Sequence, residues 1–338
     1  MASHPDRRET LALLAAATAF ARPRLVSAAP VEISLTEARA RFFLPVGING
    51  QGGMSFVLDT GSPAHVISES LATRLNLPVV GRRRLRAYDG GGDSSVVRVE
   101  RFSVGGTTPA PANLVVWPDQ RLEGNSGLIG YPLLAEGAVL SLGARTLSLG
   151  PAASEGGTAV RAEIGRGGAV LLGGLPEAEG RFAFDTGAQE MTISSGYHAR
   201  IADNPAYRDA PKIVVRGPGG QSDLTRVLGF RPEAMRFGDF VCANPLVRIA
   251  QAGDGRDGVF QGVDGLIGVA LLRRYVWAIQ PARLSVLSEV APPPRPAGLP
   301  ALAPGQLGTP LTIPPQGGPS PFGGVSFGAP VFEPAPSK

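Results

Sequence analysis

The chain of 338 residues is poor in cysteine, lysine and histidine. Its only cysteine, Cys242, excludes an intramolecular disulfide, leaves no cysteine near the N-terminus to accept lipid, and is expected to be a small buried residue. The three histidines, His4, His65 and His198, form no His/Cys cluster at metal-ligand spacing. We therefore expect no metal and no cofactor, and we place His65 and His198 at the surface.

The positive charge comes almost entirely from arginine. The net charge is +4, with 2 lysines among the 32 basic residues, and this bias indicates coding composition rather than a site for a polyanion. We expect no nucleic-acid partner. A cluster over residues 82–86, Arg-Arg-Arg-Leu-Arg, either contacts an acidic substrate or is a solvated edge, and the sequence leaves both interpretations open.

The N-terminus has no apolar run long enough to cross a membrane, and we expect no transmembrane span. The run Leu11–Ala21 is too short for a bilayer, but it follows Arg7-Arg8 and precedes the small residues Val26-Ser27-Ala28. This order predicts a signal peptide over residues 1–28 and an exported protein, periplasmic or extracellular. The paired arginines resemble a twin-arginine signal, although Thr10 departs from it, so the export route stays open.

The C-terminal segment, residues 291–338, is rich in proline and glycine and is expected to be a disordered tail. A wall tether, a partner ligand and a spacer all fit its composition. The pattern Gly-Val-Ser-Phe-Gly at 324–328 imitates a serine hydrolase motif, but no strand precedes it and no histidine follows it.

The most informative feature of the sequence is an internal repeat. Residues 56–62 are Phe-Val-Leu-Asp-Thr-Gly-Ser and residues 182–188 are Phe-Ala-Phe-Asp-Thr-Gly-Ala, so that Asp59 and Asp185 are 126 positions apart (185 − 59). The segment Gly-Leu-Ile-Gly at 127–130 recurs at 265–268, 138 positions later (265 − 127). Gene duplication explains both copies, with an insertion in the second copy that the Gly- and Asp-rich residues 252–264 would contain.

Asp254, Asp257 and Asp264 lie in this segment and are expected in a solvated loop rather than a calcium site.

Short strands and frequent turns predict an all-β architecture. A serine precedes each expected helix as an N-cap would. The expected strands are Val31–Leu35, Arg41–Ile48, Met54–Leu58, Val96–Val99, Ala169–Leu172 and Arg181–Phe184, with turns at 49–53 and 173–180, and the expected helices are Glu69–Leu75 and Gly196–Ala202.

These motifs together resemble the aspartic peptidase superfamily, in particular its retropepsin-like bacterial branch with two Asp-Thr-Gly units fused in one chain. The resemblance covers about Val31 to Leu287. It implies a bilobal aspartic-protease (acid protease) fold, all-β, with two retropepsin-like lobes related by a pseudo-two-fold axis. We assign residues 29–150 to the N-terminal lobe and residues 151–290 to the C-terminal lobe.

The resemblance places Asp59 beside Asp185 as a catalytic pair. Two adjacent carboxyls share a proton, so one can take a proton from water while the other donates to a peptide carbonyl. A glycine after each Asp-Thr pair lets the chain turn sharply and offers an N–H, and the resemblance implies that the threonines bond across the lobes. A serine hydroxyl is available to Asp59 alone. The expected supporting residues are Thr60, Gly61, Ser62, Thr186 and Gly187.

A glycine-rich hairpin is expected to cover the cleft in each unit. Tyr88, Gly90 and Gly91 follow Asp59 by about thirty residues, and Gly217 and Gly219 follow Asp185 at a similar distance. In single-chain relatives such as pepsin, a tyrosine lies on the first flap, and Tyr88 is the candidate here. The alternative is that both clusters are simple hairpin turns and Tyr88 an ordinary strand residue.

The sequence thus predicts an aspartic endopeptidase that acts on a protein or peptide as a monomer with its lobes paired within the chain. One alternative is a catalytically inactive envelope peptide-binding or regulatory protein with the same fold. Two carboxylates forced together at an energetic cost argue against a pure binding role. Another alternative is that each unit pairs with a second chain.

Overall fold

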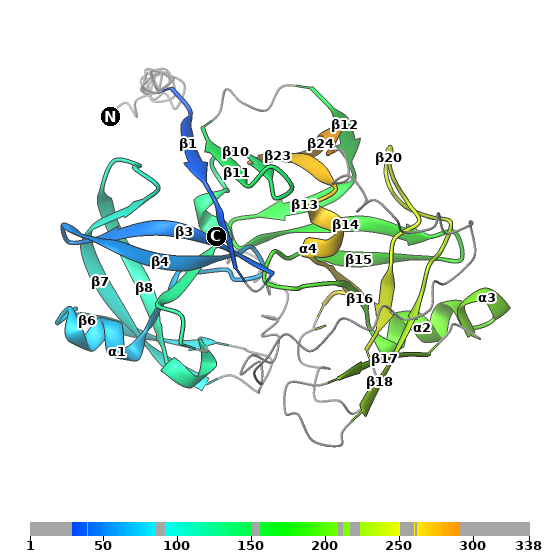
Figure 1. The fold of residues 1–338 in the computed structure, drawn as a ribbon, viewed down its shortest axis with the longest axis horizontal. Helices are drawn as coiled ribbons and strands as arrows, with labels where there is room; N and C mark the ends of the chain where they lie inside the picture. The colour runs from blue at the N-terminus through cyan, green and yellow to red at the C-terminus, as the bar shows by residue number, and fades with distance from the viewer. Residues whose placement is uncertain are drawn as a thin grey trace, which may run out of the picture.

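The computed structural model describes residues 29–38, 40–85, 92–122, 124–150, 156–208, 212–216, 224–250, 260 and 262–290. Strands dominate these residues and the helices are short, so the all-β class predicted from the sequence is confirmed. Figure 1 shows two lobes, the first coloured blue to cyan and the second mainly green to yellow. The expected signal peptide and the expected tail lie outside the described residues.

The first lobe is built on an eight-stranded sheet. Its strands follow the order β2-β3-β4-β9-β5-β8-β7-β6, and β3 pairs with β7 as well. The bounds are β2 Thr36–Ala38, β3 Arg41–Ile48, β4 Gln51–Asp59, β5 Val66–Ser68, β6 Val79–Leu85, β7 Gly92–Val104, β8 Ala110–Trp117 and β9 Gly127–Gly130, with helix α1 Glu69–Arg74 and the 3₁₀ turns η1 Asp119–Arg121 and η2 Tyr131–Leu133.

The second lobe is built on a ten-stranded sheet. Its order is β17-β18-β21-β16-β22-β15-β14-β19-β20, and β13 pairs with β14. The bounds are β13 Ala162–Gly165, β14 Gly168–Leu175, β15 Ala178–Phe184, β16 Met191–Ile193, β17 Lys212–Arg216, β18 Leu224–Phe230, β19 Ala234–Phe237, β20 Phe240–Ala243, β21 Val247–Ile249 and β22 Gly265–Ile267, with helices α2 Ser195–Ile201, α3 Pro205–Arg208 and α4 Val269–Leu272.

A six-stranded antiparallel sheet joins the two halves of the chain. Its order is β1-β11-β10-β23-β24-β12, so three strands come from each half. The central pair is β10 with β23, where Val139 lies opposite Ala278. The bounds are β1 Val31–Ser34, β10 Ala138–Ser141, β11 Thr146–Leu149, β12 Thr158–Val160, β23 Tyr275–Gln280 and β24 Arg283–Glu289.

The sequence repeat is also a repeat of topology. In the first lobe β4 runs parallel to β9, β9 antiparallel to β5, and β5 parallel to β8. In the second lobe β15, β22, β16 and β21 make the same three pairings. Each strand that leads to an Asp-Thr-Gly turn therefore lies beside the strand with the Gly-Leu-Ile-Gly sequence, which supports duplication as the origin of the two lobes.

Glycine begins both supporting strands for a steric reason. A Cβ on Gly127 would collide with the Val66 carbonyl and the Phe56 ring, and a Cβ on Gly265 would collide with the Thr192 carbonyl and the ring of Phe182. Each of these obstructing residues in the second lobe is 126 positions after its counterpart. The close approach of strand to strand thus requires the absence of a side chain at the same place in both lobes.

The two predicted helices are present and are capped by serine: α1 begins at Glu69 as predicted, and α2 begins at Ser195, one residue before the predicted start. Ser68 Oγ accepts from Leu71 N at the start of α1, and Ser194 Oγ accepts from Tyr197 N at the start of α2.

None of the helices in the described ranges has the length and apolar character needed to cross a membrane.

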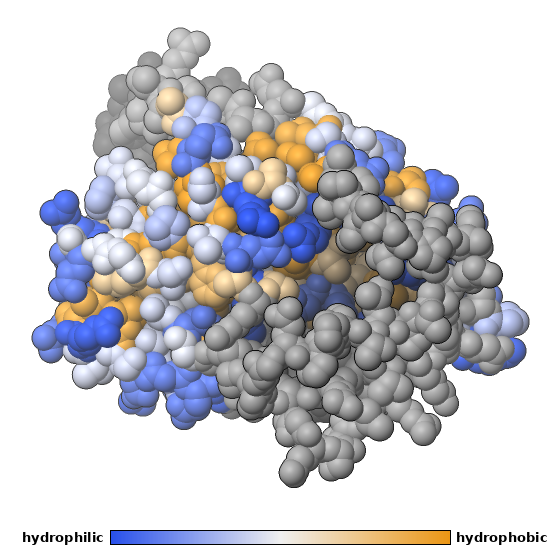
Figure 2. Space-filling view, in the orientation of Figure 1, coloured by the Kyte–Doolittle hydropathy of each residue, from blue (hydrophilic) through white to orange (hydrophobic). Residues whose placement is uncertain are grey.

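Alternation along the strands builds the core. On β3, Phe42, Leu44, Val46 and Ile48 are buried, and the residues that alternate with them are partly or fully exposed. Figure 2 shows charged and apolar side chains interspersed over the described part of one face. Of the described residues, the large hydrophobic ones that stay exposed are Val79, Val80 and Val241.

Both expected turns are longer than the observed ones. Strand β4 already starts at Gln51, and β14 runs to Leu175 with β15 resuming at Ala178, so the turn predicted at 173–180 is wrong in extent. Gly173 lies inside strand β14. Glycine is required there because a Cβ would collide with the Arg236 carbonyl of the neighbouring strand β19. A close backbone approach, not a turn, explains this glycine.

Candidate active site

The two carboxyls of the repeat converge at the contact between the lobes. Asp59 is the last residue of β4, Asp185 directly follows β15, and neither has any exposed surface. A Cβ built on Gly61 would lie 2.6 Å from Asp185 Oδ1, and one built on Gly187 would lie 2.6 Å from Asp59 Oδ1. Each glycine thus faces the carboxyl of the other lobe, and any side chain there would displace that carboxyl.

The threonines of the two turns hold the lobes together reciprocally. Thr60 N donates to Thr186 Oγ1 at 3.0 Å, and Thr186 N donates to Thr60 Oγ1 at 2.9 Å. Each hydroxyl then donates across the interface, from Thr60 to the Phe184 carbonyl and from Thr186 to the Leu58 carbonyl, both at 2.8 Å. Four buried hydrogen bonds therefore fix the relative position of the residues just before and after each aspartate.

The backbone supplies unequal support to the two carboxylates. Asp185 Oδ1 accepts from Gly187 N at 2.8 Å and from Ala188 N at 3.2 Å, whereas Asp59 Oδ1 accepts from Gly61 N at 3.0 Å. Asp59 Oδ2 is buried, and no N–H or O–H donor of the described residues reaches it; a proton shared with Asp185 would supply its hydrogen bond. Burial, and next the charge of Asp185, raise the pKa of Asp59 well above its usual value.

Ser62 does not assist Asp59 with its hydroxyl, contrary to the prediction. Ser62 Oγ donates to the Ala64 carbonyl at 2.7 Å, two residues further along the chain, and Ser62 N donates to the backbone carbonyl of Asp59. The hydroxyl therefore closes a local turn, a use that serine often takes where the chain bends. Its contribution to the aspartate pair is confined to shaping the loop.

The strands with the Gly-Leu-Ile-Gly sequence lie beneath the turns. Tyr131 N donates to the Ser62 carbonyl at 2.9 Å, and Val269 N donates to the Ala188 carbonyl at 2.8 Å. Gly130 lies opposite Asp59 in the β4–β9 pairing. These contacts place a second layer of backbone hydrogen bonds directly under each aspartate turn.

His65 is part of this support in the first lobe only, which corrects its assignment to the surface. Gly130 N donates to His65 Nδ1 at 3.1 Å, and the His65 ring lies 5.5 Å from the Phe102 ring. Burial lowers the pKa of His65 to about 4, so the ring is neutral and can accept this bond. The corresponding residue of the second lobe is Met191, 126 positions later.

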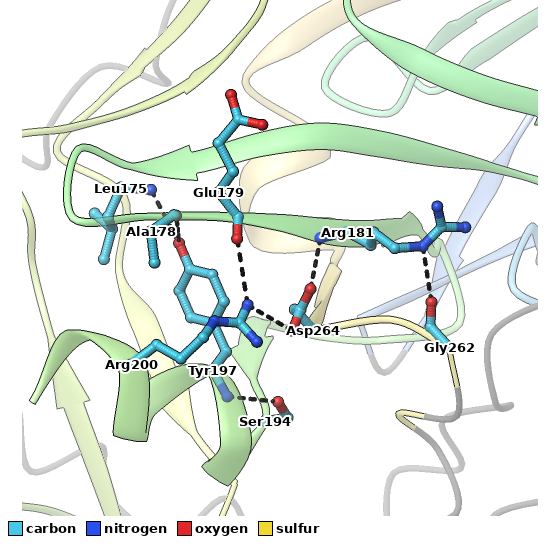
Figure 3. A network of polar contacts seen from close by, with 9 residues as sticks. All are labelled: Leu175, Ala178, Glu179, Arg181, Ser194, Tyr197, Arg200, Gly262 and Asp264. Atoms are coloured by element: carbon cyan, nitrogen blue, oxygen red, sulfur yellow. Dashed lines mark hydrogen bonds and ion pairs between the residues drawn. The ribbon is translucent and has the colours of Figure 1, made fainter.

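Asp264 also has a structural role, and the expectation of a solvated loop is wrong for it. In the network of Figure 3, its carboxylate accepts from Arg181 N at 2.9 Å and from Arg200 Nη2 at 2.7 Å. The carbonyl of Asp264 accepts from Ser194 N. Tyr197 Oη donates to the Ala178 carbonyl at 2.6 Å in the same network. The contacts fix α2 against β15 and hold the residue that directly precedes β22.

The predicted flap residues lie outside the described residues, between strands that the structure does describe. Leu85 of β6 pairs with Gly92 of β7, and Tyr88, Gly90 and Gly91 come between them in the sequence. In the second lobe Arg216 pairs with Leu224, and Gly217 and Gly219 come between them. The arginine cluster begins on the edge strand β6, where Arg82 and Arg83 are exposed.

The chemistry available at the site is that of the two carboxyls. Among the described residues no group of three or more His, Cys, Asp or Glu side chains is arranged to hold a metal ion. Cys242, far along the chain in β20, is buried as predicted.

Arg41, at the start of β3, is a residue of the site that was not predicted from the sequence; its charge lowers the pKa of Asp59 against the effects of burial and of Asp185. The tight turn at Asn49-Gly50 pairs Ile48 with Gln51, and a symmetrical continuation of that pairing would set Arg41 opposite Leu58. An irregularity between Val46 and Ile48 shifts the register by one residue, so the turn alone does not predict that Arg41 lies level with Asp59.

The paired Asp-Thr-Gly turns, each supported by a parallel strand beneath it, define a two-lobed all-β fold of the aspartic-protease kind, as the sequence predicts. A family model described as aspartyl protease matches residues 44–133, which contain the first of the two turns. No curated protein matches the sequence. Solved structures with a detectable likeness include basic 7S globulin from soybean, with 8% identity over 77% of this chain and 95% of that chain and a TM-score of 0.46.

Proposed function

We propose that this protein is an aspartic endopeptidase in which Asp59 and Asp185 together activate a water molecule. The observation that carries the proposal is the convergence of both carboxyls at one buried point, where each faces the glycine of the opposite turn. Burying two carboxyls side by side is costly, and the four threonine hydrogen bonds could hold two lobes together without placing a carboxyl pair at their contact.

The unequal hydrogen bonds suggest roles for the two carboxyls. Two backbone N–H groups stabilise the charged form of Asp185, and burial with the neighbouring charge favours the protonated form of Asp59. Asp185 would accept a proton from the attacking water, and Asp59 would donate its proton to the carbonyl oxygen of the peptide. Water forms the new bond to carbon, so the reaction needs no covalent intermediate with the protein.

The remaining predicted residues have supporting roles in this proposal. Thr60 and Thr186 fix the distance between the carboxyls, Gly61 and Gly187 leave room for them, and the glycine-rich segments would cover a bound peptide. The expected signal peptide suggests that the enzyme acts outside the cytoplasm on a protein or peptide substrate. Both lobes of the pair come from one chain, which is the arrangement that a monomeric enzyme needs.

The test is cleavage of a diverse peptide mixture by the full-length chain from acidic to neutral pH, with cleavage sites identified by mass spectrometry. Asp59→Asn and Asp185→Asn should each lower the rate by about 10²-fold or more, and the double variant should be no worse than either, because the two carboxyls act as one unit. Asp239→Asn, at an exposed carboxyl in the second lobe, serves as the matched control and should cleave normally.

The competing function is an inactive envelope protein that binds peptides between the same lobes. Well-folded wild type that cleaves nothing, yet retains peptides which both aspartate variants release, would replace the enzymatic proposal with this one. Loss of cleavage in only one of the two single variants would also contradict a shared pair, because it would show that one carboxyl works alone.

A further inference from the structure

The two aspartates of the pair face different residues on the neighbouring strand. The β3–β4 pairing sets Phe43 opposite Val57, and two further residues along each strand bring Arg41 opposite Asp59. Residues directly opposite each other in an antiparallel pair project from the same face of the sheet. Arg41, a half-buried residue, is thus placed on the same face of the sheet as Asp59, and its charge acts on the Asp59 carboxyl.

The same position in the second lobe has no side chain. The β14–β15 pairing sets Val170 opposite Ala183, and two further residues bring Gly168, the first residue of β14, opposite Asp185. Since the lobes otherwise repeat each other closely, the arginine is a one-sided addition to a symmetrical frame.

The backbone around Arg41 is held against the second aspartate turn. Gln189 Nε2 donates to the Ala40 carbonyl at 2.9 Å, which ties the residue before Arg41 to the loop that follows Asp185. Ala40 has a positive φ of 56°, so the chain turns sharply just before β3 begins. The position of Arg41 relative to the pair is therefore fixed from both lobes.

We propose that Arg41 is a positioning residue of the aspartate pair, whose positive charge compensates on the Asp59 side for the backbone N–H that Asp185 alone receives. Ala188 N donates to Asp185 Oδ1, whereas the equivalent Ser62 N donates to the carbonyl of Asp59 instead. Without a compensating charge the proton would reside almost permanently on Asp59. With it, the two carboxyls are closer in acidity, and the proton can be exchanged between them during turnover.

The groups that face Asp59 leave Arg41 as the source of this compensation. The second lobe contributes Asp185, which opposes ionisation of Asp59, and β9 contributes the uncharged Gly130. Beneath Gly130 lies His65, which burial keeps neutral above a pKa of about 4. Arg41 lowers the pKa of Asp59, in agreement with the register.

The experiment isolates each carboxyl and titrates it without reference to catalysis. In full-length Asp185→Asn protein with ¹³C-labelled aspartate, NMR follows the titration of Asp59 as the one remaining carboxyl of the pair. In Asp59→Asn protein it follows Asp185 in the same way. Adding Arg41→Gln should raise the midpoint of Asp59 by up to about one pH unit and move that of Asp185 by clearly less. Arg41→Lys should retain most of the wild-type behaviour, and Arg101→Gln, at an exposed arginine of β7, should change neither midpoint.

Equal shifts of both carboxyls, or none, would overturn the proposal. Arg41→Met keeps the apolar stem if the glutamine variant fails to fold, and loss of fold in both neutral variants would show that the role of Arg41 is structural. The catalytic consequence rests on the proposed function: Arg41→Gln should move the upper limb of the pH–rate profile to higher pH. If wild type cleaves no peptide while the midpoints shift as expected, only the proposed function fails.

Discussion

Thr60 and Thr186 each donate a backbone N–H to the hydroxyl of the other, although 126 residues separate them in the sequence. Each of these buried N–H groups finds its acceptor in the opposite lobe. The lobes are therefore held in register at one point, directly beside the carboxyls.

Thr60→Val should remove both hydrogen bonds of that hydroxyl and leave Thr186 N without an acceptor. Because an unsatisfied buried N–H costs about 1–3 kcal/mol, the free energy of unfolding should fall by at least this amount. Thr60→Ser keeps the hydroxyl and should lose far less. Chemical denaturation of both variants checks this, and similar stability of the valine and serine variants would show that the cross-lobe bonds contribute little.

Asp59→Asn should stabilise the protein at neutral pH. The pKa of Asp59 is raised by burial and by Asp185, so folding at pH 7 must either protonate this carboxyl or bury its charge. A raised pKa gives stability that is complete below the unfolded pKa of about 3.9 and lost as pH rises through the folded value. The advantage of the asparagine variant over wild type should grow with rising pH and vanish in acid. Unfolding curves at several pH values check this, and a constant difference would contradict it.

His65 should make the first lobe sensitive to acid. Its pKa is about 4 in the folded chain and about 6.5 when unfolded, so the unfolded state binds more protons between these values. Stability should therefore fall by up to about 3 kcal/mol as pH drops from 6.5 to 4. His65→Met, which copies the second lobe at Met191, should flatten that dependence. A His198→Met variant, altered in the second lobe, is the control; equal slopes in wild type and His65→Met would sink the idea.

Gly265→Ala should disturb the strand beneath Asp185. The added methyl would collide with the Thr192 carbonyl and the Phe182 ring, so we expect a loss of about 1–3 kcal/mol in stability and lower activity. Gly52→Ala on β4 meets no atom within 4 Å and is the matched control. Thermal unfolding separates the two, and comparable melting temperatures would contradict the steric account.

The convergence of Asp59 with Asp185 was predicted through the resemblance of the duplicated motifs to the aspartic peptidase superfamily, which implies that the two turns meet. The capped helices followed from Ser68 and Ser194, whose side chains act on residues three positions ahead. Local chemistry of this kind is visible in a sequence. The extent of strand β14 could not be predicted from the sequence, because the reason for glycine at position 173 is the close approach of a strand more than sixty positions away.

The hydrogen-bond partners of side chains were harder to predict from the sequence than the strands and turns on which those side chains lie. Ser62 and His65 lie within six residues of Asp59, and both were misjudged, since the partner of each is decided by the path of the folded loop. The serine hydroxyl found the nearby Ala64 carbonyl, and the histidine found an N–H on a strand 65 positions later. Arg41 was overlooked because no motif contains it, and only strand register brings it to the pair.

The six-stranded sheet has a consequence for how the chain folds. Its central pairing joins Val139 to Ala278, so 139 residues must be arranged before β10 meets β23 (278 − 139). Contacts so distant in sequence form slowly, because closing a long loop costs entropy before any contact is gained. We expect each lobe to collapse on its own sheet first, with the shared sheet and the aspartate contact completed together in a late docking step. An intermediate with two formed lobes would then already be compact but would not yet have a working pair of carboxyls.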